Sequence, residues 1–213
     1  MKAKEPEARR GRSPWALAAR VYSQKESVRT AVPRTNYPFV VVCVLAISSA
    51  PVSAEVTSVG PSGFAVKHEV AVKAAPGTVY DALTVKVGSW WNPDHTFSHD
   101  AKNLSIAAVP GGCFCERFPD SGGVQHMTVV YASPGKALRM TGALGPLQGL
   151  GLAGSMTWDL SKSEAGTKLV VTYGVGGYMA GGFEKIAPIV DGVVGEQVGR
   201  LKTFLETGSP VQK

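Results

Sequence analysis

Hydrophobic and polar residues alternate with a period of two along much of the chain after residue 63. Between residues 64 and 73 an apolar residue or a histidine occupies every second position from Val66 to Val72, which predicts a strand with one buried face. The same period, interrupted by turns rich in glycine and proline, predicts six further strands. We place them near residues 102–109, 113–118, 124–131, 136–143, 153–161 and 167–175.

Helical spacing appears in two places. Residues 78–84 and 87–92 predict two short helices directly after the first strand, the second of them ended by Asn92-Pro93. Near the C-terminus, Pro188 can open a long helix and Gly208 can stop it. Its apolar face recurs at spacings of three and four and comprises Ile186, Ile189, Val190, Val193, Gln197, Leu201, Phe204 and Leu205.

Three glycines, Gly192, Gly195 and Gly199, fall on the opposite side of this long helix. Each costs about 1 kcal/mol relative to alanine in a helix interior. Either a neighbour such as a partner helix packs closely against them, or the loss of helix stability is tolerated. The order of elements predicts an α+β fold in which a curved antiparallel sheet of about seven strands encloses the long helix and leaves a cavity between the two.

The positive charge lies at the N-terminus. Residues 1–54 hold nine basic and three acidic residues, which accounts for the net charge of +6, so residues 55–213 are neutral and nucleic acid is excluded as a partner. The apolar run of residues 39–48 is too short to span a bilayer, and Val52-Ser53-Ala54 follows as a cleavage site. We expect a signal peptide over 1–54 with a long basic n-region, and a mature periplasmic or secreted domain over 55–213. Membrane contact is expected only through an uncleaved signal segment, and homodimer formation stays undecided.

Six segments carry a family resemblance in their order and spacing: residues 70–83, Trp90-Trp91, residues 110–118, residues 154–160, residues 166–172 and residues 197–206. They resemble the SRPBCC (START-like, Bet v 1-like) superfamily, with bacterial polyketide cyclase/dehydrase-like or Hsp90-ATPase-activator-like members most similar. The resemblance implies a helix-grip fold over about residues 63–207 and a hydrophobic cavity, in a superfamily that contains both carriers and enzymes.

Aromatic and methionine side chains give the main binding signal. Strand alternation places Met156 and Trp158 on one face, where they can line a pocket. We expect the domain to hold a small apolar or amphipathic ligand rather than to catalyse a reaction. The candidate ligand-binding residues are Trp90, Trp91, Met140, Met156, Trp158, Tyr173, Tyr178 and Phe183.

Glu116 and His126 lie on consecutive strands, about equally far from the turn between them. If both side chains face the cavity, Glu116 can orient His126 as a general base, as in a cyclase or dehydratase. The alternative is a surface pair or residues on opposite faces, because a shift of one residue in register reverses the face. A protein–protein interaction module is a further alternative for the whole domain.

No cofactor or metal is expected. Gly149–Gly154 spells the dinucleotide fingerprint, but a strand pattern rather than a helix follows it. The loop of residues 94–100 contains two histidines and two aspartates, with no distant ligand to complete a metal site. Cys113 and Cys115 are spaced for neither a relaxed mutual disulfide nor a zinc site, so we expect two small buried apolar side chains.

Overall fold

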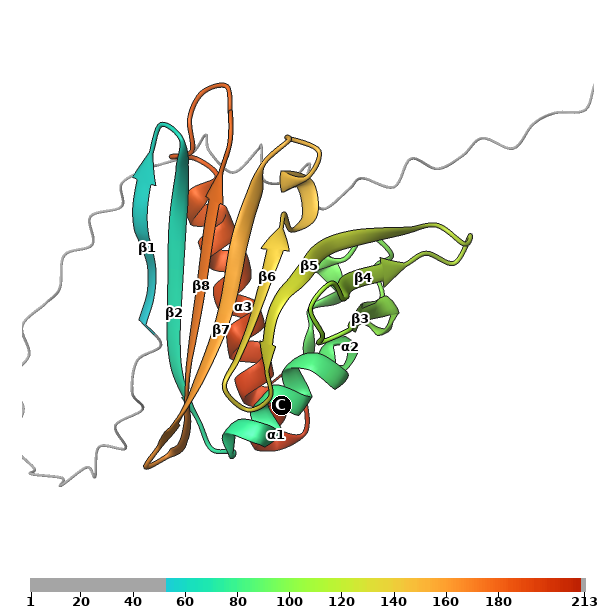
Figure 1. Ribbon diagram of the computed structural model, residues 1–213, viewed down its shortest axis with the longest axis vertical. Helices are drawn as coiled ribbons and strands as arrows, with labels where there is room; N and C mark the ends of the chain where they lie inside the picture. Colours follow the sequence, from blue (N-terminus) through green and yellow to red (C-terminus); the bar gives the residue numbers. More distant parts are fainter. Residues whose placement is uncertain (1–52, 212–213) are drawn as a thin grey trace, which may run out of the picture. The chain divides into compact units, whose positions relative to one another are not determined.

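The computed structural model describes residues 53–211, whose strands form one curved antiparallel sheet (Figure 1). The predicted signal segment lies outside these residues, apart from Ser53 and Ala54. Across the sheet the strands follow the order β1-β2-β8-β7-β6-β5-β4-β3. Their bounds are β1 Ser53–Gly60, β2 Gly63–Val72, β3 Leu104–Ile106, β4 Cys113–Arg117, β5 Gly123–Ser133, β6 Ala137–Gly142, β7 Ala153–Ser163 and β8 Gly166–Gly176.

Seven of these strands correspond to the segments predicted from the alternation, and β1 is additional. β1 forms a hairpin with β2 through the Gly60–Gly63 pair at its closed end, and four of the five side chains from Glu55 to Val59 are exposed. A strand with so little buried surface leaves no apolar alternation in the sequence. The position after Ala54, where we predict cleavage, falls two residues into β1, and the ladder with β2 continues from Glu55 onward.

From β4 to β8 the chain runs as a meander in which each strand pairs with the next. The exception to such local pairing is the ladder between β2 and β8. It aligns Phe64 with Val175 at one end and Val72 with Thr167 at the other. This ladder attaches the N-terminal hairpin to the end of the meander and completes the sheet.

Three α-helices cover one face of the sheet: α1 (Pro76–Val85), α2 (Val87–Trp90) and α3 (Ala187–Thr207). α3 runs along the sheet, and α1 and α2 lie across the end at which α3 terminates (Figure 1). Pro188 stands in the first turn of α3, and Gly208 caps its end with a left-handed backbone, as the sequence predicts. In residues 53–211 no helix is long and apolar enough to cross a bilayer.

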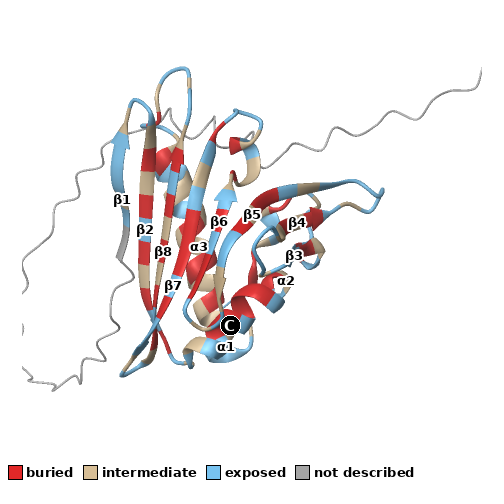
Figure 2. Cartoon of the chain, viewed as in Figure 1, coloured by how far each residue is buried: buried red, intermediate tan, exposed pale blue. Residues whose placement is uncertain are grey.

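The core lies between the sheet and these helices, and buried positions form bands across the central strands (Figure 2). Met156 on β7 pairs with Met140 on β6 and with Tyr173 on β8, and all three side chains are buried. Trp158, two residues further along β7, is buried on the same side, as predicted.

The predicted apolar face of α3 is correct in part. Gln197 and Leu201 are buried, but Ile189 is 47% exposed, and Val194 and Val198 are buried in its place. The helix is therefore rotated about its axis relative to the prediction, so that Val194 and Val198 belong to the buried side.

The rotation brings a glycine of α3 against the sheet. A Cβ atom at Gly195 would lie 2.7 Å from Cε1 of His68, a fully buried imidazole on β2, whereas nothing lies within 4 Å of a Cβ at Gly192 or Gly199. His68 Nε2 also lies 3.0 Å from Asp191 Oδ1, a close approach without hydrogen-bond geometry. At Gly195 the closely packed neighbour is thus a strand rather than a partner helix.

Candidate functional site

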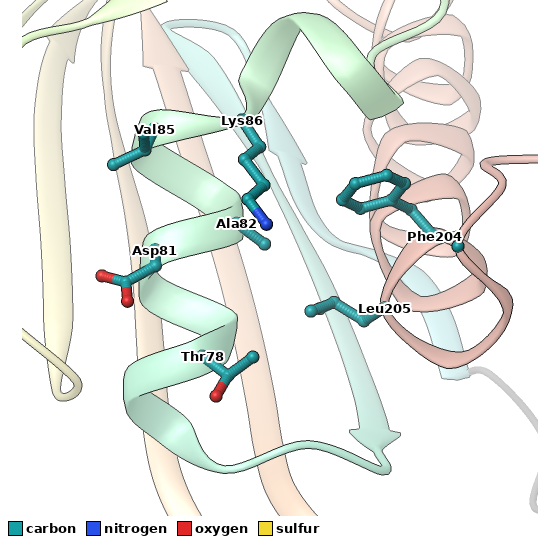
Figure 3. Close-up of a pocket in the computed structure, with 8 residues that line it drawn as sticks. Thr78, Asp81, Ala82, Val85, Lys86, Phe204 and Leu205 are labelled. Atoms are coloured by element: carbon teal, nitrogen blue, oxygen red, sulfur yellow. The ribbon is translucent and has the colours of Figure 1, made fainter.

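A groove opens between α1 and the last turns of α3, with a volume of about 680 Å³ (Figure 3). Phe204 and Leu205 extend from α3 toward α1, and Lys86 reaches between the two helices (Figure 3). Ala82 is buried on the α1 side, whereas Val85 at the end of α1 is 78% exposed. The remaining lining residues are Thr78, Asp81 and Gly208.

This groove combines apolar walls with a charged rim. Aliphatic and aromatic carbon comes from Ala82, Phe204 and Leu205, while Asp81 and Lys86 are exposed and of opposite charge. Small-molecule sites have this composition and occupy roughly 300–1,000 Å³. The groove therefore has the size and chemistry to accept a molecule with an apolar body and a polar end.

The buried side of the groove joins the core through Trp90. The Trp90 indole donates a hydrogen bond of 2.9 Å from Nε1 to the carbonyl of Ala82. Its ring also contacts Trp158 on β7, with centroids 6.2 Å apart in an edge-to-face arrangement. Ala82 thus lies both in the wall of the groove and next to the Trp90–Trp158 pair.

From Trp158 a continuous row of aromatic rings runs toward the β3–β4 edge of the sheet. Neighbouring rings in the row have centroids between 5.2 and 6.5 Å apart. The row begins at the buried ring of Trp158, and Phe97 near its other end is half-exposed. Its members in order are Trp158, Trp90, Trp91, Phe114, His126, Phe97 and Phe118.

Two members of this row carry buried polar atoms that have no hydrogen-bond partner among the described residues. They are Nε1 of Trp158 and Nδ1 of His126, and the hydroxyl of Tyr80 on α1 is in the same state. Each side chain is at most 4% exposed. Leaving a buried donor or acceptor unsatisfied costs about 1–3 kcal/mol, so each atom marks a place where a water or a ligand group would be stabilised.

Glu116 and His126 form a buried pair on one face, which is one of the two arrangements that the sequence left open. Nε2 of His126 lies 3.1 Å from Oε2 of Glu116, and the two side chains are almost completely buried. The carboxylate also accepts hydrogen bonds from the backbone N–H groups of Phe97 and Ser98, which fixes its orientation. The imidazole is stacked on Phe97, with planes 16° apart, and also contacts the Phe114 ring, with centroids 5.2 Å apart.

A β-bulge in β5 places His126 in this position. Phe114 pairs with Met127 and Cys115 pairs with Gln125, so His126 is the extra residue between them. Both His126 and Met127 are buried as a result. Because of the extra residue, two consecutive side chains of β5, His126 and Met127, face the core, and the alternation continues from Met127 to Val129.

The charge state of the pair follows from its surroundings. Burial raises the pKa of Glu116, but the hydrogen bonds from Ser98, Phe97 and His126 outweigh burial and hold this pKa below its ordinary value. Burial lowers the pKa of His126 more than the nearby carboxylate raises it. The pair is therefore an ionised glutamate and a neutral imidazole. Because Nε2 must donate to the carboxylate, Nδ1 carries the free lone pair, which is the form of a general base.

Residues 92–95, which overlap the start of the histidine- and aspartate-containing loop of residues 94–100, are held to α3. His95 Nε2 lies 2.9 Å from Glu196 Oε2, and Asn92 donates hydrogen bonds from its amide side chain to Glu196 and from its backbone N–H to Gln197. Across residues 53–211 no group of three or more His, Cys, Asp or Glu side chains is arranged to hold a metal ion.

The expectation for the two cysteines is wrong. Cys113 and Cys115 form a disulfide with their Cα atoms 5.3 Å apart, and both residues are half-buried rather than buried. On a fully extended strand the separation of residues two apart is about 6.6 Å. β4 is shorter than an extended strand at this point, opposite the β5 bulge, and the two cysteines lie within disulfide distance.

Seven of the eight candidate ligand-binding residues lie in the core. Trp90 and Trp91 belong to the aromatic row with Trp158, and Tyr173 accepts a hydrogen bond from the Leu144 N–H while burial raises its pKa to about 12. Tyr178 does not join them, because it is 85% exposed in the loop before α3. The other core members are Met140, Met156 and Phe183.

The groove was not predicted from the sequence. Phe204 and Leu205 were assigned to the apolar face of the terminal helix, and Val85 at the end of α1 and Lys86 directly after it were given no role. A signal was present, since Val85 is an apolar side chain at the end of a helix whose buried side is complete without it. Its meaning depends on the angle between α1 and α3, which the sequence does not specify.

Comparison with known proteins gives a likeness of fold. No family model and no curated protein matches the sequence. A conserved protein of unknown function from Enterococcus faecalis is similar in structure at 18% identity, with a TM-score of 0.50 over 73% of this chain and 78% of that chain. A protein from Mesorhizobium loti also gives 0.50, at 16% identity over 67% and 96%. The Aha1 dimer from Colwellia psychrerythraea gives 0.48, at 22% identity over 68% and 97%. The shared fold is of the helix-grip type.

Proposed function

We propose that this protein is an exported member of the SRPBCC superfamily that binds a small apolar or amphipathic molecule. The observation that carries the proposal is the groove between α1 and α3, which has apolar walls, a charged rim and a volume of about 680 Å³. The apolar body of the ligand lies against Phe204 and Leu205, and its polar end lies near Asp81 and Lys86. Contact with Ala82 then couples occupancy to the Trp90–Trp158 pair.

The test uses the full chain and two probes, laurate and 1-anilinonaphthalene-8-sulfonate, both with an apolar body and an anionic end. We expect saturable binding that weakens about tenfold in the Phe204→Ala/Leu205→Ala double variant, because two wall contacts are removed. The matched control is Ile189→Ala, an exposed apolar residue on the same helix outside the groove.

Thermal unfolding of each variant separates lost binding from lost folding. Tryptophan fluorescence should change on binding, since Ala82 bonds to Trp90. Absence of saturable binding to either probe, or equal affinities in the groove variant and the control, would refute the assignment to this groove. Native mass spectrometry of the purified chain would identify a co-purified ligand.

A second function is favoured by one observation, the lone pair of His126 Nδ1. An oriented neutral imidazole beside an ionised carboxylate suits removal of a proton from carbon next to a carbonyl, as in cyclases and dehydratases of this fold. Phe97 is half-exposed and stacked on His126, so its ring covers the approach from solvent.

Proton abstraction can be measured without knowing the substrate. Aromatic 1,3-diketones incubated with the protein in D₂O should exchange their α-protons faster than in buffer, and His126→Gln should abolish the difference. Phe97→Ala should increase the exchange by opening the approach. If wild-type exchange equals the buffer rate, acid–base catalysis at this pair is rejected for this substrate class while the binding proposal stands.

A further inference from the structure

The disulfide lies on the face of β4 that points away from the core. Along the strand, Phe114 and Glu116 are buried, whereas Cys113 and Cys115 are half-buried. In the sheet, Cys115 is paired with two exposed residues, Ser105 on β3 and Gln125 on β5. Cys113 is paired with Thr128 on β5. Solvent and small solutes therefore approach the sulfur atoms from the outer side of the sheet.

The covalent ring that the disulfide closes is very small. The two cysteines are two positions apart, so the bond constrains the unfolded chain much less than a bridge across a long loop. It also joins residues of one strand that hydrogen bonds to β3 and β5 already hold. A bond in this place contributes little to holding elements together, and partly exposed disulfides are the ones that exchange with other thiols.

Charge near the sulfur atoms favours exchange. Arg117 follows Cys115 by two residues on the same strand and is exposed, so its guanidinium lies on the same face as the disulfide. A neighbouring positive charge stabilises a thiolate and makes it a better leaving group.

We propose that Cys113–Cys115 is a reversible thiol–disulfide exchange site whose reactant is a thiol. The thiolate of the reactant attacks one sulfur, the S–S bond breaks, and its electron pair leaves on the other sulfur as a thiolate. With a dithiol reactant, its second thiolate then breaks the mixed disulfide and leaves as the reactant's own disulfide. The protein gains two electrons and two protons, and the reverse sequence oxidises a dithiol. The proposal rests on neither the groove nor the chemistry of the Glu116–His126 pair.

Reduction has a structural consequence on the core side of β4. The residue between the two cysteines is Phe114, whose ring contacts both Trp91 and His126. Without the S–S bond the Cα separation of 5.3 Å is free to increase toward about 6.6 Å of an extended strand, which moves Phe114 relative to Trp91. Tryptophan fluorescence is therefore expected to report the redox state.

The experiment titrates the full chain, without denaturant, in buffers of reduced and oxidised glutathione. Free thiols are alkylated and the tryptic peptide of residues 103–117, which contains both cysteines and excludes Cys43, is analysed by mass spectrometry. In air we expect the peptide to be unalkylated and two hydrogens lighter than its dithiol form. In buffers of millimolar reduced glutathione it should become doubly alkylated, and adding oxidised glutathione should restore the disulfide form. The fluorescence of the intact protein should follow the same curve.

Two results would overturn the proposal. One is that Cys113 and Cys115 of the air-oxidised protein react with the alkylating reagent, and the other is that the disulfide resists reduction until the chain is unfolded. A parallel titration with thioredoxin distinguishes a small thiol from a protein dithiol as the reactant. Cys115→Ser should trap a mixed disulfide with glutathione at Cys113, and the Cys113→Ser/Cys115→Ser variant should lose the fluorescence response. The wild-type titration decides the question even if a variant fails to fold.

Discussion

The contact between Gly195 of α3 and His68 of β2 predicts an unusual response to alanine. Gly195→Ala gains about 1 kcal/mol of helix propensity. Its new Cβ, however, would lie 2.7 Å from Cε1 and 3.1 Å from Nδ1 of His68. The imidazole is completely buried and close to Asp191, so it has no free space into which it can turn.

Inserting a methyl group into such packing destabilises by about 1–3 kcal/mol. We therefore expect Gly195→Ala to lower the free energy of unfolding by about 1 kcal/mol. Gly192→Ala and Gly199→Ala, which meet nothing within 4 Å, should raise it by up to about 1 kcal/mol. The three glycines lie in one helix, so they make a matched set that differs by about 2 kcal/mol between the packed and unpacked positions.

Urea unfolding followed by circular dichroism measures these differences. If the slope of the free energy of unfolding against urea concentration is the same in all variants, they unfold by the same reaction. Adding His68→Ala to Gly195→Ala should remove part of the loss caused by Gly195→Ala, because the clashing ring is gone. If Gly195→Ala stabilises as much as Gly192→Ala, then α3 does not pack on His68 in the way described, and the rotation of the helix is wrong.

Three further predictions concern the remaining contacts. Stability should fall as the pH drops below about 6.5, because native His126 stays neutral while its unfolded form takes up a proton. It should fall again below about 4.5, because unfolded Glu116 takes up a proton while the native carboxylate, whose pKa is lowered, stays ionised. Unfolding curves recorded from pH 7 to pH 3 measure both steps, and Glu116→Gln should flatten the second. Glu196→Ala should lower stability by no more than about 1 kcal/mol yet accelerate amide hydrogen exchange in residues 92–95, and unchanged exchange would contradict the tie to α3. Gly154→Ala should destabilise the protein by about 2 kcal/mol or more, because its Cβ would lie 2.9 Å from the Tyr173 ring and closer still to the carbonyl oxygen of Gly174. A thermal unfolding midpoint close to that of the wild type would argue against this packing.

Most of the sheet could be predicted because its strands have one buried face. Met156 and Trp158 show this, since alternation alone places both on the inside. β1 was not predicted because it buries little and so has no pattern. The rotation of α3 was not predicted for a related reason: Val194 and Ile189 are equally apolar in sequence, and only the packing of Gly195 on the sheet decides which of them is buried.

The site was predicted unevenly. For Glu116 and His126 the sequence left two arrangements open, one shared face or two opposite faces, and the bulge at His126, which no local signal announces, decides between them. The disulfide of Cys113 and Cys115 was missed because an ideal strand separates the two residues too widely, and the local shortening of β4 leaves no signal in the sequence. The groove depends on the angle between two helices and therefore appears only in three dimensions.

The β2–β8 ladder has a consequence for how the chain folds. β4 to β8 are hairpins whose strands are neighbours in sequence, but β2 must find β8 at a distance of about 100 residues. Closing so long a loop has an entropic cost that local hairpins do not have, and pairing of distant segments slows folding. We therefore expect the meander to form first. Until the β1–β2 hairpin docks, β8 presents an unpaired edge of up to ten residues to other chains. The interval before docking is the stage at which this protein is most exposed to aggregation.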